Sequence, residues 1–407
     1  MTRRLPIAAD RLCDLAREYG TPLYVYDADT LLERVRRLRG FDVVRYAQKA
    51  NPNLAIQALL RGAGVVVDAV SSAEIVRAQR AGFAADEIAY TADVFDRAAL
   101  ELISHTGLRV NCGSIDMLSA LARARPAAEV SLRVNPGFGH GHDARVATGG
   151  ESSKHGIWHA DMSGAIALAR DLGLSVVGLH VHVGSGSDLE NLTLAAGTFE
   201  RCAPMLSDSL RSLSAGGGIP VPYRDGERAF DLEGYAAAWR TARDRVGKIV
   251  GRAIELEVEP GRFLVAESGV LVTEVLGTKR NGEIDYALVD AGFNTLLRPA
   301  MYGAYHRIEA LNATRSALRP TVVAGPLCES GDVFTRSKSG ELDPRLLPQL
   351  ARGDLLAIAD VGAYGMSMAS RYNSQPLPAE LLIENGMARM IRRRESLDDL
   401  LAHESGL

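Results

Sequence analysis

The chain has 407 residues, of which 47% are apolar and 24% charged, and its formal net charge is −4. This length suits one large and one smaller domain, and the composition is that of a globular protein with an extensive core. No basic stripe indicates nucleic acid, and no stretch approaches the ~20 consecutive apolar residues of a membrane span. The amino terminus lacks the apolar segment of a signal peptide. We therefore expect a protein that handles small molecules, with no nucleic-acid or membrane partner.

The cysteines and lysines indicate the cellular compartment and the chemistry that the protein can perform. Four widely spaced cysteines show no CxxC pairing, so neither a disulfide framework nor a zinc cage is indicated, and we expect a cytoplasmic location. Only five of the 46 basic residues are lysines. Because arginine cannot be deprotonated to act as a nucleophile, a lysine in an apolar setting indicates a chemical role.

Short β-rich runs alternate with helical patterns through the first two thirds of the chain. The predicted strands span 43–48, 65–70, 87–92, 108–113, 129–135, 176–183, 210–215 and 254–259, and the predicted helices 52–63, 72–82, 95–105, 115–125, 160–173, 190–208 and 230–248. Eight strands with helical crossovers over ~250 residues predict a (β/α)₈ TIM barrel. A doubly wound sheet is the competing architecture, but QKANPN after the first strand is not its glycine-rich turn.

Beyond about residue 267 the pattern changes. VLVTEVLGTK, DYALVDAG, RPTVVAGP and DLLAIADVG read as strands without long helices between them, which predicts a mostly antiparallel β domain. TPLYVYD near the amino terminus is also strand-like, so we expect it to pack with this domain. The predicted domains are the barrel at 25–267 and the β domain at 1–24 and 268–407.

In a (β/α)₈ barrel, residues at the carboxyl ends of the strands face the active site. Here these positions hold Lys49, Asp68 and the segments 180–185, 216–218 and 259–262. A partly desolvated lysine amine at a strand end can attack an aldehyde to form an imine. An ordinary surface lysine is the alternative, but the scarcity of lysine favours a chemical role for Lys49.

HVHVGSGSD places His180 and His182 two residues apart on a strand, so both lie on the same face. They suit a metal pair, a flat imidazole stacked on an aromatic cofactor, or a buried hydrogen-bonded pair. A metal site needs further ligands at neighbouring strand ends, and none is evident, so we favour stacking and expect no metal. Gly184 and Ser185 add backbone N–H groups and a hydroxyl for a phosphate.

Two further segments suit an anionic cofactor. The glycines at 216–218 would let backbone N–H groups approach a phosphate, although a plain turn explains such a run equally well. In EPGR at 259–262, Glu259 can hold a pyridine nitrogen protonated, which makes the ring an electron sink. Gly261 allows close backbone approach, and Arg262 supplies a planar anion-binding fork.

Together these segments resemble the fold-type III pyridoxal 5′-phosphate (PLP) decarboxylases, which have an alanine racemase-like barrel, and within them the diaminopimelate decarboxylase family. The resemblance runs through FDVVRYAQKAN, VNPGFGHGH, TGGESSKHGIW, HVHVGSGSD, SAGGGIPVPY, EPGRFLVAESGVL, DAGFNTLLRPAMYGAYH, VVAGPLCESGDVF and GAYGMSMASRYNSQPLP. It implies PLP as the cofactor and a carboxy-lyase that converts meso-2,6-diaminopimelate to L-lysine and CO₂, the last step of lysine biosynthesis.

The resemblance also implies residue roles. Lys49 would bind the cofactor as a Schiff base, His182 would stack on its ring, and Cys328 matches the proton donor to the α-carbon. The expected cofactor contacts are Lys49, Asp68, His182, Ser185, Gly217, Gly218, Glu259, Gly261, Arg262 and Tyr364, and the expected substrate contacts are Arg262, Arg298, Tyr302, Glu329 and Tyr364. In this family the Cys-Glu segment comes from the partner subunit, so a homodimer with shared active sites is implied.

The implied substrate has two amino-acid ends. Arg262 and Arg298 suit its carboxylates, and Glu329 suits its distal ammonium. An ornithine-type substrate would leave an arginine unpaired, which is costly in a buried site. For Arg298 by itself, a surface salt bridge is the alternative.

Some alternatives stay open. A related decarboxylase acting on ornithine, lysine, arginine or carboxynorspermidine has similar motifs. An amino-acid racemase would prefer an arginine at the ring nitrogen, where this chain has Glu259, and a non-catalytic PLP-binding protein would lack the β domain. His155 of SKHG stands where many members have phenylalanine, which affects the shape of a lid loop. We expect the HGH at 140–142 to belong to that loop.

Overall fold

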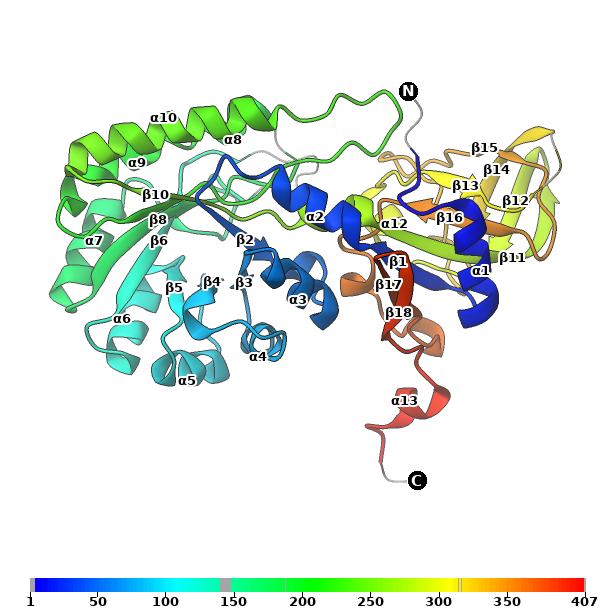
Figure 1. Ribbon diagram of the computed structural model, residues 1–407, viewed down its shortest axis with the longest axis horizontal. Coiled ribbons are helices and arrows are strands. Elements are labelled where there is room, and N and C mark those ends of the chain that lie inside the picture. Colours follow the sequence, from blue (N-terminus) through cyan, green and yellow to red (C-terminus); the bar gives the residue numbers. More distant parts are fainter. Residues whose placement is uncertain (1–3, 140–147, 187, 314, 316, 406–407) are drawn as a thin grey trace. The chain divides into compact units, whose positions relative to one another are not determined.

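The chain folds into two units, and the computed structural model describes residues 4–139, 148–186, 188–313, 315 and 317–405 (Figure 1). The first unit comprises Met1–Leu31, Pro222–Arg228 and Val265–Leu407, and the second comprises Leu32–Val221 and Ala229–Leu264. The chain therefore passes from one unit to the other four times. The domain boundary predicted after residue 24 falls inside a strand of the first unit, β1 (Leu23–Asp27).

The second unit is a closed ring of eight parallel strands with helices outside it (Figure 1). In ring order the strands are β2 (Val43–Ala47), β3 (Val66–Ala69), β4 (Ile88–Ala92), β5 (Arg109–Cys112), β6 (Glu129–Asn135), β8 (Ser175–Val181), β9 (Ser212–Ser214) and β10 (Glu255–Val258). Strand β10 pairs with β2 through Glu257 opposite Val43, which closes the ring. A short strand, β7 (Ile157–Trp158), adds to the end of β6. The predicted barrel and its eight strands are confirmed.

Helices connect successive strands of the ring. They are α3 (Leu54–Gly62), α4 (Ser72–Arg80), α5 (Arg97–His105), α6 (Ile115–Ala124), α7 (Met162–Asp171), α8 (Leu189–Leu194), α9 (Gly197–Cys202) and α10 (Leu232–Val250), with 3₁₀ turns η1 (Gln48–Ala50), η2 (Ala85–Glu87) and η4 (Ala203–Leu206). Side-chain caps define several starts; for example, Asp231 accepts a hydrogen bond from Gly234 N at the start of α10. The helix predicted at 190–208 is three short helices instead. Pro204 lies in the first turn of η4 and cannot continue the hydrogen bonds of α9.

The first unit is built on a nine-stranded, mostly antiparallel sheet. Along the main path the order is β15 (Arg345–Pro348), β14 (Leu318–Ala324), β12 (Ile284–Val289), β11 (Gly269–Asn281), β1, β17 (Ala379–Glu384) and β18 (Met387–Arg392), while β16 (Leu355–Ala359) pairs with β11 and β13 (Ile308–Ala310) pairs with β16. Strand β1 lies antiparallel to β11 and parallel to β17, so the expected packing of TPLYVYD with the later β domain is confirmed. Strands β13, β15, β17 and β18 were not predicted.

Helix α1 (Ala9–Tyr19) covers part of this sheet. Its Leu12 and Leu15 are fully buried in one cluster with Val25 of β1 and Leu381 of β17. Each such side chain contributes about 1.5–3 kcal/mol by leaving water, so the amino-terminal segment is a full member of this core. The remaining short helices are α2 (Ala28–Arg36), α11 (Arg262–Val265), η5 (Ala266–Ser268), α12 (Arg298–Tyr302), η6 (Met366–Met368), η7 (Tyr372–Ser374) and α13 (Leu397–Leu401). No helix in the described ranges is long and apolar enough to cross a membrane.

Candidate active site

Lys49 follows β2 directly, in the turn η1, and its side chain is exposed. The preceding residue is firmly anchored. The fully buried amide of Gln48 donates hydrogen bonds to the carbonyl oxygens of Asp68 at 3.1 Å and Glu74 at 3.2 Å, and it accepts one from Gln57 at 3.1 Å. The backbone at Lys49 is therefore held in place while its amine stays accessible, as attachment of an aldehyde requires.

The glycines at 216–218 lie where the ends of β8, β9 and β10 meet. Gly216 and Gly218 have φ of 65° and 105°, in the left-handed region that favours glycine. A Cβ on Gly217 would lie 2.5 Å from the carbonyl oxygen of Glu259, so this position cannot carry a side chain. The N–H groups of Gly216 and Gly217 already bind the Ser214 hydroxyl and His182 Nδ1. The turn is thus a cradle free of side chains, rather than the row of available N–H donors that the sequence suggested.

His182 lies just after β8 and accepts a hydrogen bond at Nδ1 from Gly217 N at 3.1 Å. Burial lowers the pKa of His182 well below its ordinary value, and the positive charges of Arg133 and Lys49 lower it further. The imidazole is therefore neutral, with its proton on Nε2. A neutral, flat ring fixed by the glycine turn suits the predicted stacking on an aromatic cofactor.

Glu259 is a buried carboxylate at the end of β10. Its Oε2 lies 2.7 Å from His180 Nε2, and its Oε1 accepts a hydrogen bond from Ser214 Oγ at 2.9 Å. Burial opposes its charge, but the charge and hydrogen bond of His180, with Arg45 and Ser214, bring its pKa from 4.5 to about 2. Because this folded-state pKa is depressed, ionised Glu259 stabilises the fold above the ordinary carboxyl pKa. That contribution is lost as the pH falls through about 2.

Asp68 lies near the end of β3, close to Lys49, and is only 5% exposed. Burial and the negative charge of Glu259 raise its pKa well above the ordinary value, against the opposing effects of Thr91 and Lys49. Its Oδ1 has no hydrogen-bond partner among the residues that the structure describes. A buried polar atom of this kind indicates a missing ligand group or water.

The EPGR segment brings the end of β10 against the end of β2. Ala47 N donates to Pro260 O at 3.3 Å, and a Cβ on Gly261 would lie 3.1 Å from the Cβ of Ala50. Gly261 therefore allows the end of β10 to approach closely the end of β2 and the turn that carries Lys49. Arg262, which is 8% exposed, begins α11 at this point.

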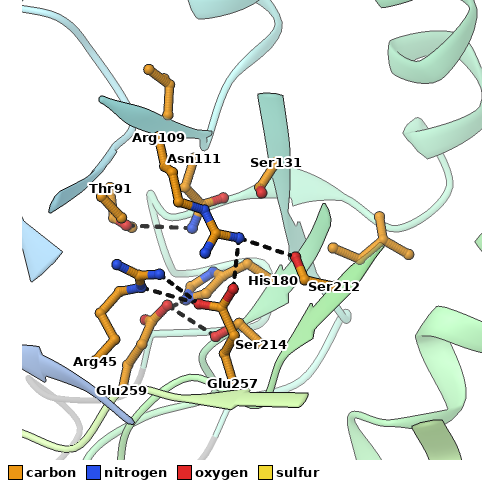
Figure 2. A pocket seen from close by; sticks show the side chains of 13 residues that line it. Arg45, Thr91, Arg109, Asn111, Ser131, His180, Ser212, Ser214, Glu257 and Glu259 are labelled. Carbon is orange, nitrogen blue, oxygen red and sulfur yellow. Dashed lines mark hydrogen bonds and ion pairs between the residues drawn. The ribbon is translucent and has the colours of Figure 1, made fainter. Parts of the chain in front are cut away.

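The barrel interior next to these residues is charged (Figure 2). Buried Arg45 binds Oε2 of Glu257 through Nε at 3.1 Å and Nη2 at 2.9 Å, and Arg109 lies 2.6 Å from the other oxygen. Arg109 also donates to Ser212 Oγ at 3.3 Å. Branched apolar side chains usually fill this space. We did not predict this cluster, although Arg45 and Glu257 stand out in otherwise apolar strands.

The loop that carries His155 is attached to the end of β4. His155 Nδ1 lies 2.5 Å from Asp93 Oδ2, and Gly156 N donates to Asp93 Oδ1 at 2.9 Å. Burial opposes the charge on Asp93, but these two hydrogen bonds and the charge of Arg133 hold its pKa below the ordinary value. The histidine of SKHG thus anchors the loop by a hydrogen bond. The HGH at 140–142 lies outside the described residues.

The predicted substrate-binding residues Arg298 and Tyr302 lie in the first unit, at the two ends of α12. Arg298 is 3% exposed and donates through Nη1 to His306 Nε2 at 2.9 Å and to Tyr223 Oη at 3.2 Å. His306 Nδ1 lies 2.9 Å from the carbonyl oxygen of Ala359, which fixes the hydrogen on that nitrogen. Arg298 is therefore held in one orientation, and the surface salt bridge considered from sequence is wrong. Tyr223 and His306 were not predicted, because their hydrogen bonds to Arg298 join separate segments of the chain.

Cys328, Glu329 and Tyr364 also lie in the first unit. Cys328 is exposed whereas Cys13, Cys112 and Cys202 are buried, and Glu329 is exposed beside it. Buried Asp332 shapes this loop by accepting hydrogen bonds from Leu327 N at 2.8 Å and Phe293 N at 2.7 Å. Tyr364 has a φ of 58°, a strained value for a residue other than glycine.

The barrel residues suit PLP. The structure brings Lys49, Asp68, His182, Gly217 and Glu259 to one end of the barrel, with an accessible amine, a neutral ring and an ionised carboxylate. An ionised carboxylate can pair with a protonated pyridine nitrogen. The glycines at 216–218 let the neighbouring strand ends pack closely, because an added Cβ there would meet backbone oxygens. No group of three metal-ligating side chains occurs in the part of the chain that the structure describes.

Comparison with known proteins agrees with this site. The family model described as "Pyridoxal-dependent decarboxylase, pyridoxal binding domain" matches residues 30–266, so the chain belongs to the pyridoxal-dependent decarboxylases. The chain is 49% identical to the diaminopimelate decarboxylase of Escherichia coli over 407 residues, which cover 98% of this chain and 97% of the relative.

Solved structures extend the similarity to three dimensions. A crystal structure of diaminopimelate decarboxylase, 48% identical, has a TM-score of 0.95 and covers 99% of this chain and 98% of its own. The diaminopimelate decarboxylase of Helicobacter pylori, complexed with L-lysine, is 34% identical with a TM-score of 0.86, and it covers 97% of this chain and 99% of its own. Both units of the chain are thus present in these enzymes.

The glycine cradle makes a direct prediction. Gly217→Ala should lower the free energy of unfolding by about 1–3 kcal/mol, because the added Cβ forces the ends of β9 and β10 apart. It should also weaken PLP binding, measured by titrating the cofactor-free protein and following visible absorbance. Gly164→Ala in α7, where a Cβ meets nothing within 4 Å, is the control: it should not lower the free energy of unfolding and should leave PLP affinity unchanged. Equal PLP affinity in both variants would refute the role of the cradle.

Proposed function

We propose that the protein removes CO₂ from meso-2,6-diaminopimelate to form L-lysine, the last step of lysine biosynthesis, with PLP as its cofactor. The observation that carries this proposal is 49% identity, over 98% of the chain, to a curated diaminopimelate decarboxylase. The L-lysine in the similar Helicobacter pylori structure supports the product. The active site of the barrel supports the cofactor independently.

The barrel residues divide the work on the cofactor. When bound, PLP supplies an electron-withdrawing ring that accepts the electrons of the broken C–C bond. Lys49 provides the attaching amine, and ionised Glu259 keeps the ring nitrogen protonated. Neutral His182 covers one face of the ring. We assign Ser185, Gly217, Gly218, Gly261, Arg262 and Tyr364 to the cofactor phosphate. Asp68 is assigned to the cofactor-binding site without a particular cofactor atom.

The first unit supplies the substrate-binding groups in this proposal. Arg298 binds a substrate carboxylate, together with Arg262 and Tyr302, and Glu329 binds the distal ammonium. The buried position of Arg298 and its fixed orientation support this role, because a guanidinium held in place loses little entropy on binding a carboxylate. Substrates with a single carboxylate would not supply the second anion that this proposal places on Arg298.

We further propose a homodimer with shared active sites. Cys328 of one subunit would give the proton of its Sγ to the α-carbon of substrate in the active site that contains Lys49 of the other, after the carboxylate has left as CO₂. The exposure of Cys328 and Glu329 in the single chain supports this arrangement, since a residue that acts in a partner's site must be accessible.

The role of Lys49 is tested by spectroscopy. Lys49→Ala should abolish both decarboxylation and the visible absorbance band of lysine-bound PLP, because the other lysines lie elsewhere on the chain. Lys248→Ala, which alters an exposed lysine of α10, should keep both. A Lys49→Ala variant that retains the lysine-bound band would show that another residue carries the cofactor.

The substrate is tested with a panel of meso-diaminopimelate, L-ornithine, L-lysine and L-arginine, with CO₂ and amine products measured. Only meso-diaminopimelate should react efficiently in the wild type. Arg298→Ala should lower kcat/KM for it on the order of a hundredfold, the cost of losing charged hydrogen bonds to a carboxylate. Arg319→Ala, at a half-exposed position, is the control. Equal losses on single-carboxylate substrates would make Arg298 structural, and efficient ornithine decarboxylation would favour the related-enzyme alternative.

Shared active sites predict complementation between inactive variants. Cys328→Ala and Lys49→Ala should each be nearly inactive alone. After the two are mixed and allowed to exchange subunits, half of the dimers contain one intact site, so activity should recover to about a quarter of the wild-type value. Recovery is measured as lysine formed per milligram of protein. No recovery in verified mixed dimers would place both residues of a site on one chain.

A further inference from the structure

His180 makes the closest contact with Glu259 inside the barrel (Figure 2). It lies on β8, is 2% exposed, and places Nε2 2.7 Å from Oε2 of Glu259. Ser214 on β9 binds the other oxygen at 2.9 Å and accepts a hydrogen bond from Gly216 N. Each carboxylate oxygen therefore has a donor from a neighbouring strand, and Glu259 is held from two sides.

The hydrogen atom in the His180 contact belongs to the imidazole. An ionised carboxylate can only accept, so the hydrogen bond requires N–H at Nε2 of His180. The other ring nitrogen, Nδ1, is buried and has no hydrogen-bond partner among the described residues. The contact thus requires a hydrogen on Nε2 of His180. Within the described part of the chain, the side chain of His180 therefore forms its one hydrogen bond with Glu259.

The surrounding charges favour an ionised Glu259. The charged or titratable groups around the pair are Arg45 on β2, Asp68 on β3, Arg109 on β5, Arg133 on β6, His182 after β8, Tyr235 on α10, Glu257 on β10 and Lys49 after β2. Arg45 and Arg109 both bind the single carboxylate of Glu257. The two guanidinium charges exceed the one carboxylate charge of Glu257, and an ionised Glu259 balances the excess positive charge.

We propose that His180 is a positioning residue for the reaction, which keeps Glu259 ionised and oriented toward the pyridine nitrogen of PLP. His180 acts through Glu259 and does not itself touch the cofactor. Without its N–H, the buried carboxylate loses its strongest donor and becomes easier to protonate. A protonated Glu259 cannot hold the ring nitrogen protonated, so the ring withdraws electrons less strongly. The inference rests on the proposed role of Glu259 and is independent of which amino acid is the substrate.

Two near-isosteric substitutions test this role. The amide of His180→Gln can place N–H near the position of Nε2, whereas that of His180→Asn is too short to reach Glu259. We expect His180→Asn to lower kcat roughly tenfold to a hundredfold, the cost of a hydrogen bond to a charged group, with KM nearly unchanged. His180→Gln should recover most of the rate. Ser214→Ala should resemble His180→Asn, and Ser212→Ala, the same change two residues away on β9, should resemble the wild type.

A spectroscopic reading separates positioning from a structural role. The visible absorbance of the PLP-bound protein is recorded against pH for each variant, with thermal melting as the check on folding. In His180→Asn the change in absorbance that accompanies protonation of Glu259 should occur at higher pH than in the wild type, because the carboxylate is easier to protonate. Folded Asn and Gln variants with the same rates and pH profiles as each other would overturn the proposal, whatever the substrate.

The position of the hydrogen on His180 can also be measured in the wild-type protein, so this test does not depend on the folding of a variant. ¹⁵N NMR of histidine-labelled protein distinguishes the two tautomers of a buried imidazole. A hydrogen on Nε2 of His180 supports the proposal, and a hydrogen on Nδ1 with bare Nε2 contradicts it. If the chain instead fails to decarboxylate meso-diaminopimelate while these results hold, only the substrate assignment fails.

Discussion

The structure depends on keeping one buried carboxylate ionised. Glu259 sits at the end of β10, where burial alone would neutralise it, and the contacts around it reverse that outcome. His180 comes from β8, Ser214 from β9 and Arg45 from β2, so the charge persists only while the ring of strands is closed. Barrel closure therefore also maintains the ionised carboxylate that the proposed cofactor role of Glu259 requires.

The fold was largely predictable because its signals are local. Each barrel strand is a short β-rich run followed by a helix, and all eight were found from this alternation. The predictions failed where distant residues decide the structure. Strand β17 is identified by its pairing with β1, more than 300 residues earlier, and the helix predicted at 190–208 is divided into short pieces ending at the turn with Pro204. The spacing of apolar residues along the sequence shows neither the pairing of distant strands nor the interruption of a helix by one proline.

The candidate site shows the same division. Lys49 and Glu259 could be identified because a strand end is a special position and their chemistry is distinctive. The tautomer of His182, the charge state of Glu259 and the anchoring of Arg298 depend on hydrogen bonds between segments far apart in the sequence. The N–H groups of the glycine turn illustrate the limit most clearly. The sequence suggests that they are available for phosphate, but two of them are already bonded within the protein.

The path of the chain has a consequence for how this gene can be altered. Because 222–228 belongs to the first unit while its flanking segments belong to the second, no single cut divides the sequence into two complete units. Tyr223, which holds Arg298, would stay with the barrel if the carboxy-terminal part were exchanged for that of a relative. Recombination near residue 265 would therefore separate Tyr223 from Arg298, whose orientation it helps to fix. A point substitution in the carboxy-terminal part, by contrast, leaves the segment that carries Tyr223 matched to the rest of its unit.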